Sequence, residues 1–155
     1  MKGLRLIIVS VFVLLLSACT NSLKNMDVTS LRLLSLAPKS LDSVTALVEI
    51  GINNPSMSFE LSDINATIRF KAKDAIYVTA DRLVVDARTE KLYDLPLNGK
   101  CAEDFNPFDL LQLVSNKADT KDISISVEAK VSMRGGLGKN IEYNEITLDQ
   151  LLDKI

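Results

Sequence analysis

The sequence contains no histidine and no tryptophan, and it has only three tyrosines and two cysteines. Without histidine the chain cannot form Ser-His-Asp or Cys-His hydrolase sites. It also lacks the ligand of most catalytic zinc sites and the usual general base near neutral pH. The shortage of aromatic residues argues against a carbohydrate site, because such sites use aromatic rings as platforms. The composition therefore disfavours the commonest enzyme classes and sugar-binding proteins.

A long hydrophobic run is also missing. The apolar stretch LIIVSVFVLLL at residues 6–16 is well short of the roughly 20 residues that span a bilayer. It follows the basic residues Lys2 and Arg5 and precedes the small residues Ser17 and Ala18. This order is typical of a secretory signal peptide that is removed from the mature protein.

The sequence LSAC at residues 16–19 resembles the lipobox of bacterial lipoproteins. The resemblance implies that residues 1–18 are removed and that Cys19 becomes an acylated N-terminus, held stably because it carries more than one acyl chain. Thr20, in place of an aspartate, implies by the same resemblance an outer-membrane location, and the lack of a following acidic cluster favours the periplasmic face. The alternative is an ordinary cleaved signal in which Cys19 is incidental.

The mature chain has no strong charge of either sign. Removal of residues 1–18 leaves 18 − 2 = 16 basic and 20 acidic side chains, a formal charge of −4. The basic residues are scattered singly and form no stripe, so nucleic acid is not expected as a partner. The remaining 155 − 18 = 137 residues suffice for one domain. Cys101 is the single thiol left beside the anchor, which excludes an intramolecular disulfide.

Two segments show strict alternation of apolar and polar residues, which is typical of strands buried on one face. In residues 43–53 the apolar positions are Val44, Ala46, Val48, Ile50 and Ile52. In residues 122–134 they are Ile123, Ile125, Val127, Ala129, Val131 and Met133. Both segments are predicted to be strands that face a common core.

Shorter strand candidates surround these two. They lie at residues 31–37, 63–72, 75–85, 91–101 and 139–148, and the turn-forming GGLG at 135–138 precedes the last of them. Short strands separated by turns predict an all-β sandwich or barrel. One short helix is predicted in NPFDLLQLVSN, residues 106–116, where Asn106 can cap it, and it is expected to pack over an open end of the sandwich.

The segment VEIGINNPSMSFELSDINATIRF, residues 48–70, resembles the late-embryogenesis-abundant (LEA) type 2 domain, also called the water stress and hypersensitivity domain. In that family an alternating strand ends in Asn-Pro, here Asn54-Pro55, and a second alternating strand follows a loop. The likeness extends over residues 30–148 and implies a fibronectin-III-like or immunoglobulin-like antiparallel β-sandwich. The family often has glycine at the next hairpin, where this chain is expected to turn at Lys73-Asp74.

Candidate site residues have structural interpretations that outweigh functional ones. Glu49, Asp63 and Glu128 fall on polar strand faces and are expected to be solvated. Cys101 is expected to be a small buried residue at the end of a strand, and Asn54-Pro55 is interpreted as a strand terminator. No catalytic pair, cofactor or metal site is predicted.

The chain is thus divided into a signal peptide (1–18), a lipidated N-terminus and short tether (19–29) and a β-sandwich domain (30–155). The expected function is that of an envelope lipoprotein acting as a non-catalytic binding or scaffolding module, with a role in envelope stress protection suggested by the resemblance. The expected partners are the membrane, through acylated Cys19, and an envelope protein bound at an edge strand near 31–37 or 139–148. The alternative is binding or transfer of lipid or another apolar ligand.

Overall fold

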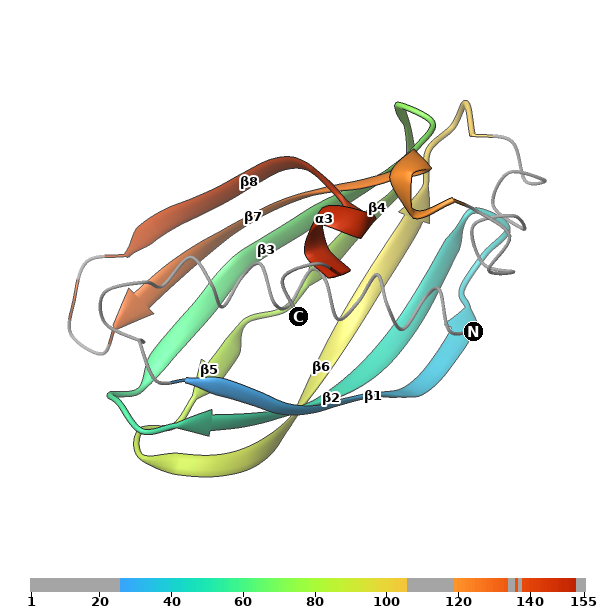
Figure 1. The fold of residues 1–155 in the computed structure, drawn as a ribbon. Helices are drawn as coiled ribbons and strands as arrows, with labels where there is room; N and C mark the ends of the chain where they lie inside the picture. The colour runs from blue at the N-terminus through green and yellow to red at the C-terminus, as the bar shows by residue number, and fades with distance from the viewer. Residues whose placement is uncertain (1–25, 106–118, 134–135, 137, 153–155) are drawn as a thin grey trace.

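The computed structural model describes residues 26–105, 119–133, 136 and 138–152. Figure 1 shows a fold built almost entirely of strands. The strands are β1 (Asp27–Pro38), β2 (Ser43–Asn54), β3 (Phe59–Phe70), β4 (Lys73–Ala80), β5 (Leu83–Val85), β6 (Thr89–Cys101), β7 (Ile123–Met133) and β8 (Lys139–Thr147). A 3-10 turn, η1 (Thr120–Asp122), precedes β7, and a short helix, α3 (Leu148–Leu152), follows β8.

All strand pairs are antiparallel, in the order β1-β2-β6-β4-β3-β7-β8, with β5 also paired to β3. β4 pairs with both β3 and β6, so it joins the β1-β2-β6 layer to the β3-β7-β8 layer (Figure 1). Side chains from both layers form one hydrophobic cluster. The expected all-β antiparallel sandwich is therefore confirmed.

The two alternating segments are confirmed as strands with one buried face. In β2, Val48, Ile50 and Ile52 have no exposed surface, and β7 alternates in the same way up to Ala129. The expected burial of Val44 is wrong, because this side chain is 36% exposed. Its neighbours in register are Pro38 and Gly99, and a glycine has no side chain with which to cover it.

β3 differs from expectation at both ends. It begins at Phe59, earlier than the predicted 63–72, and it contains a bulge around Asp63, which has a φ of 51°. The following turn consists of Lys71 and Ala72, two residues before the expected Lys73-Asp74. Both turn residues have positive φ, 50° and 64°, as a two-residue hairpin turn of type I′ requires.

The N-terminal edge of the domain lies earlier than the predicted boundary at residue 30. β1 begins at Asp27, within the segment 19–29 that was expected to be a tether. The physical reason is that Met26 and Val28 pack against the core cluster. The predicted strand at 75–85 is divided into β4 and β5, whereas those at 31–37 and 91–101 are confirmed within longer strands.

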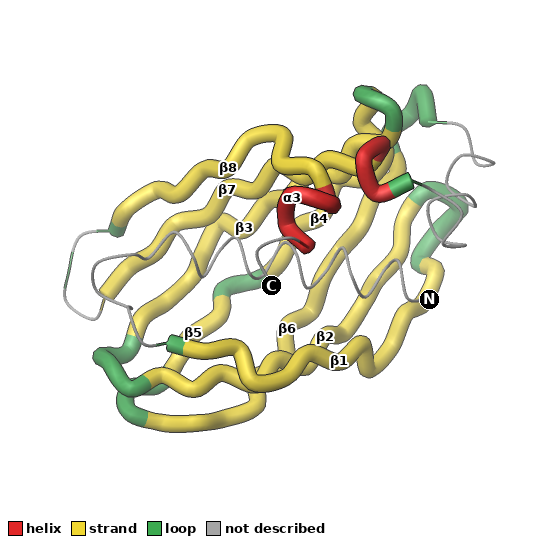
Figure 2. Tube along the Cα trace, in the orientation of Figure 1, coloured by secondary structure: helices red, strands yellow, loops and turns green. Residues whose placement is uncertain are grey.

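The helix predicted within residues 106–116 lies outside the described residues, as do the predicted signal peptide (1–18) and Cys19. The last strand, predicted over 139–148, ends at Thr147, and Leu148 instead begins the helix α3, which was not predicted (Figure 2). At its start Gln150 Oε1 accepts a hydrogen bond from the Thr147 backbone N–H at 3.3 Å, and Leu148 is buried in the core. Within the described ranges, no helix has the length and apolar character needed to span a membrane.

Candidate functional site

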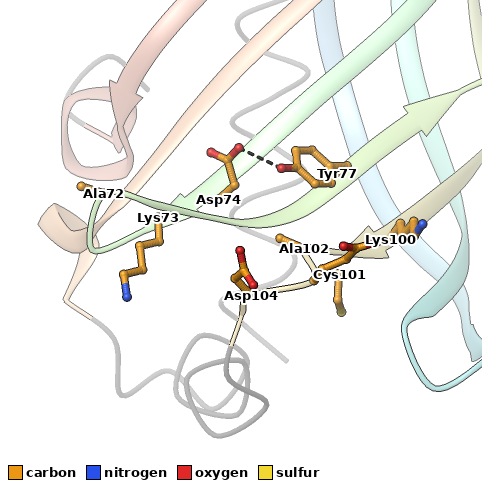
Figure 3. A pocket seen from close by; sticks show the side chains of 9 residues that line it. Ala72, Lys73, Asp74, Tyr77, Lys100, Cys101, Ala102 and Asp104 are labelled. Carbon is orange, nitrogen blue, oxygen red and sulfur yellow. Dashed lines mark hydrogen bonds between the residues drawn. The ribbon is translucent and has the colours of Figure 1, made fainter.

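A pocket of about 750 Å³ opens at the end of the sandwich where β4 begins and β6 ends. Its lining comes from Ala72, from Lys73, Asp74 and Tyr77 of β4, and from residues 100–104. Figure 3 shows the charged side chains of this lining spread around the opening, with Tyr77 turned toward Asp74. The pocket combines both signs of charge with one tyrosine and one thiol.

The titratable pair in this pocket is held in its ordinary charge state. Arg69 Nε donates a hydrogen bond to Asp74 Oδ1 at 2.7 Å, and Tyr77 Oη donates to Asp74 Oδ2 at 2.9 Å. These two bonds, the arginine's first, lower the pKa of Asp74, and the bond to Asp74 raises the pKa of Tyr77. Asp74 is therefore a weak base and Tyr77 a weak acid, which is the reverse of what proton transfer needs near neutral pH.

Cys101 lies at the end of β6 and lines the same pocket. The thiol is free and partly covered, less buried than expected because the strand ends there. Burial raises the pKa of the Cys101 thiol, and the negative charge of Asp42 raises it further. A thiol with a raised pKa is mostly protonated near neutral pH and is a poor nucleophile.

The three carboxylates considered from sequence are not brought together. Glu49 lies on β2, Asp63 in the β3 bulge and Glu128 on β7. Asp63 and Glu128 are exposed as expected, but the expectation for Glu49 is wrong: its side chain is only 14% exposed. The cause is Arg32, its register partner on β1, whose Nε donates to Glu49 Oε1 at 2.7 Å. The described residues contain no group of three or more potential metal ligands.

A polar network on the outer face of the second layer was missed from sequence. Its centre is Arg69 on β3, which bonds Asp74 on one side and Glu145 Oε1 of β8 on the other, at 2.8 Å. Ser126 Oγ of β7 lies 3.4 Å from Arg69 Nη1 and accepts from the backbone N–H of Glu145. This network joins four strands, and its charges are paired.

Asn54 does more than end a strand. It is fully buried, and its Nδ2 donates to the backbone carbonyl oxygens of Met57 and Asp86 at 3.0 and 2.9 Å. Its Oδ1 accepts from the backbone N–H of Ser56 at 3.0 Å. One amide side chain thus ties the β2–β3 loop to the segment that follows β5.

The two ends of the sheet order are β1 and β8, at the positions where edge strands were expected. β8 carries the charged residues Lys139, Glu142 and Glu145, and it has a register shift and a positive φ of 50° at Glu145. Charges and bulges of this kind protect an edge from pairing. β1 is longer and presents Leu34 and Leu36, which are 45% and 37% exposed.

Comparisons with known proteins show a likeness of fold only. No protein-family model matches the chain, and no characterised protein matches it in sequence. Among solved structures, a protein from Archaeoglobus fulgidus is similar over 78% of this chain and 97% of its own, with 11% identity and a TM-score of 0.47. A protein from Arabidopsis thaliana is 18% identical over 79% of this chain and 80% of its own, with a TM-score of 0.39. The yeast GGA1 GAE domain is 8% identical over 79% of this chain and 98% of its own, with a TM-score of 0.30.

Likenesses at these identities and TM-scores assign no activity, ligand or partner. The class of protein is the one that the strand order itself defines, an antiparallel all-β sandwich. Among the described residues, its surface has a pocket lined by polar and charged residues and an edge strand, β1, with two exposed leucines.

Proposed function

We propose that the chain is a lipid-anchored protein of the bacterial envelope whose LEA type 2-like sandwich binds another protein without catalysing a reaction. The observation that carries the proposal is the β1 edge. In the described residues β1 pairs with β2 alone, so one side of a twelve-residue strand keeps its backbone donors and acceptors free. An extended segment of a partner can add to such an edge, where main-chain hydrogen bonds provide affinity and side-chain contacts provide specificity.

The side chains along β1 suit this mode of binding. Residues 33–38 include no charge, and Leu34 and Leu36 remain accessible to a partner. The β1–β2 hairpin continues this apolar surface with Leu41, which is fully exposed, and Val44. β1 also has two register shifts against β2, but exposed apolar surface on a free edge is typical of an interaction site and a liability in a protein that has no partner.

The absence of catalysis is proposed from the charge states in the pocket. A general base or nucleophile needs a pKa moved toward the working pH. The shifts at Asp74, Tyr77 and Cys101 run in the opposite direction. The residues that line the pocket are therefore better suited to holding the β3–β4 turn and the end of β6 in place than to catalysing a reaction.

An anchor on Cys19 would orient the domain. The eight residue steps from Cys19 to Asp27 reach at most about 29 Å when fully extended. β1 then runs about 40 Å to the hairpin at Lys39, because each strand residue advances about 3.3 Å. The Asn54 loop, next to the start of β1 in the register, would face the outer membrane, and the exposed leucines would point into the periplasm.

Binding of an apolar ligand inside the sandwich is the second candidate, and the packing favours it less. Ile50 of β2, Leu95 of β6 and Ile125 of β7 come from both layers and have at most 1% of their surface exposed. Interiors filled in this way are close-packed and leave little volume for a lipid tail. Native mass spectrometry of the purified protein would reveal a co-purifying lipid and would then favour the second candidate.

Two experiments test the proposal. Metabolic labelling with an acyl-chain analogue should mark the wild type and the control variant Cys101→Ala but not Cys19→Ala; equal labelling of both variants would exclude the anchor. Crosslinking in intact envelopes should recover a reproducible protein partner that is lost in Leu34→Pro, which removes a β1 backbone donor, and kept in the β8 control Asn140→Pro. Turnover of an envelope substrate, abolished by a single carboxylate substitution, would refute a non-catalytic role.

A further inference from the structure

We infer that the occupant of the β1 edge is β1 of a second copy of this chain, paired antiparallel across a two-fold axis at Leu33. The inference rests on the proposed function, because it takes β1 as the binding edge and specifies what binds there. A two-fold pair uses the same surface on both copies and closes on itself, so it ends at a dimer and leaves no unpaired β1 edge.

The charges at the two ends of β1 support self-pairing. Asp27 begins the strand, and Lys39 follows its last residue. When two copies run antiparallel with Leu33 on the axis, Asp27 of each copy lies opposite Lys39 of the other. The arrangement therefore creates one Asp27–Lys39 ion pair at each end of the interface. It places no like charges opposite each other.

The centre of the strand is compatible with the same register. Leu34, the extra residue at a register shift against β2, is pushed outward and lies opposite Arg32 of the second copy. The Arg32 guanidinium is already paired with Glu49 of its own chain, so its aliphatic stem is free to cover the leucine. Leu36 lies opposite Ser30. The interface thus buries exposed apolar surface without burying an unpaired charge.

The other edge does not offer this complementarity. Antiparallel self-pairing of β8 about its central residue, Tyr143, would place Glu142 opposite Asn144 and Lys139 opposite Thr147. No opposite charges meet in that register, whereas β1 brings Asp27 opposite Lys39; register shifts do not distinguish the two edges, because β1 has two against β2. The geometry therefore points to β1, not β8, as the self-associating edge.

Photocrosslinking from the full chain in native membranes tests the inference. A benzophenone amino acid replaces Leu34, and in a matched control it replaces Asn140 on β8. The expected product from position 34 is an adduct of twice the chain mass, with little from position 140. An adduct of another mass from position 34 would overturn the second copy as occupant while the edge-binding function stands. The absence of any adduct from position 34 would overturn both.

Charge exchange tests the register. Asp27→Lys and Lys39→Asp should each lower the yield of the double-mass adduct about three- to tenfold, the range expected when two exposed ion pairs become repulsive. The double variant restores both pairs in reversed order and should recover the wild-type yield. Lys130→Asp, an exposed reversal on β7, should leave the yield unchanged. A double variant as weak as the single variants would overturn the register and with it the inference.

Discussion

Replacement of Asn54 by alanine is expected to lower the free energy of unfolding by about 3 kcal/mol. The side chain is fully buried and makes three hydrogen bonds, at 2.9, 3.0 and 3.0 Å, to backbone groups of two separate loops. Each such bond contributes about 1 kcal/mol net, and more where the abandoned partner stays buried. Because domains of this size are stable by only about 5–15 kcal/mol, the loss would be a large share of the total.

Urea denaturation followed by circular dichroism measures this effect. With a slope of about 1.5 kcal/mol per molar, a loss of 3 kcal/mol moves the midpoint down by about 2 M while the slope itself stays unchanged. The matched control is Asn98→Ala, an exposed asparagine on the outer face of β6, which should change stability by less than about 0.5 kcal/mol.

The reasoning would be refuted by an Asn54→Ala variant as stable as the Asn98→Ala control. Asn54→Asp provides a second criterion, since it keeps the oxygen that accepts from Ser56 but removes the donor and buries a charge. Its deficit should be at least as large as that of alanine at neutral pH. A buried carboxyl has a raised pKa in the folded state, so the deficit should shrink as the pH falls and the carboxyl is protonated.

Three further predictions concern the faces, the charges and the turn. Val127→Asp should cost several kcal/mol because it buries a charge, whereas Glu128→Ala next to it should cost less than about 0.5 kcal/mol; the reverse order in urea denaturation would mean that the faces are inverted. The folded-state pKa of Asp74 is lowered, so its stabilising contribution exists above the unfolded pKa of about 3.9 and is lost as pH falls through the folded value. Asp74→Asn should therefore be less stable than wild type at pH 7, by at most about 1 kcal/mol, with a difference that disappears in acid. Ala72→Gly should stabilise by about 0.5–1 kcal/mol in thermal unfolding because it relieves a left-handed alanine, whereas Ala75→Gly, at a fully buried position of β4, should destabilise.

Local signals explain most of what was predictable about the fold. Alternation in residues 43–53 and 122–134 identified the inward faces of β2 and β7, because the two-residue period of a strand is a property of adjacent residues. The segment Thr147-Leu-Asp-Gln150 has the spacing of a capping box, so the start of α3 also has a local signal.

Two features, one in the lining of the candidate pocket and one at the candidate residue Glu49, could not be predicted from local sequence signals. Lys71 and Ala72 form the hairpin turn although neither has the composition of a type I′ turn, so the pairing of β3 with β4 overrides the local preference. Glu49 lies on a polar face by period, yet its side chain is largely covered because β1 brings Arg32 directly opposite. Neither outcome can be inferred without knowledge of which strands are neighbours.

The sequence by itself thus determined most of the strand segments, the inward faces of β2 and β7 and which enzyme classes the lack of histidine disfavours. Only the tertiary structure decided the strand order, with β6 placed between β2 and β4, and the contacts that depend on it. Arg69 meets Glu145 across 76 residues, and Asn54 meets Asp86 across 32. The physical reason is that periodicity and capping are fixed by bonds along the chain. Register and partner choice instead come from the burial of apolar faces and the satisfaction of polar groups by the whole assembly of strands.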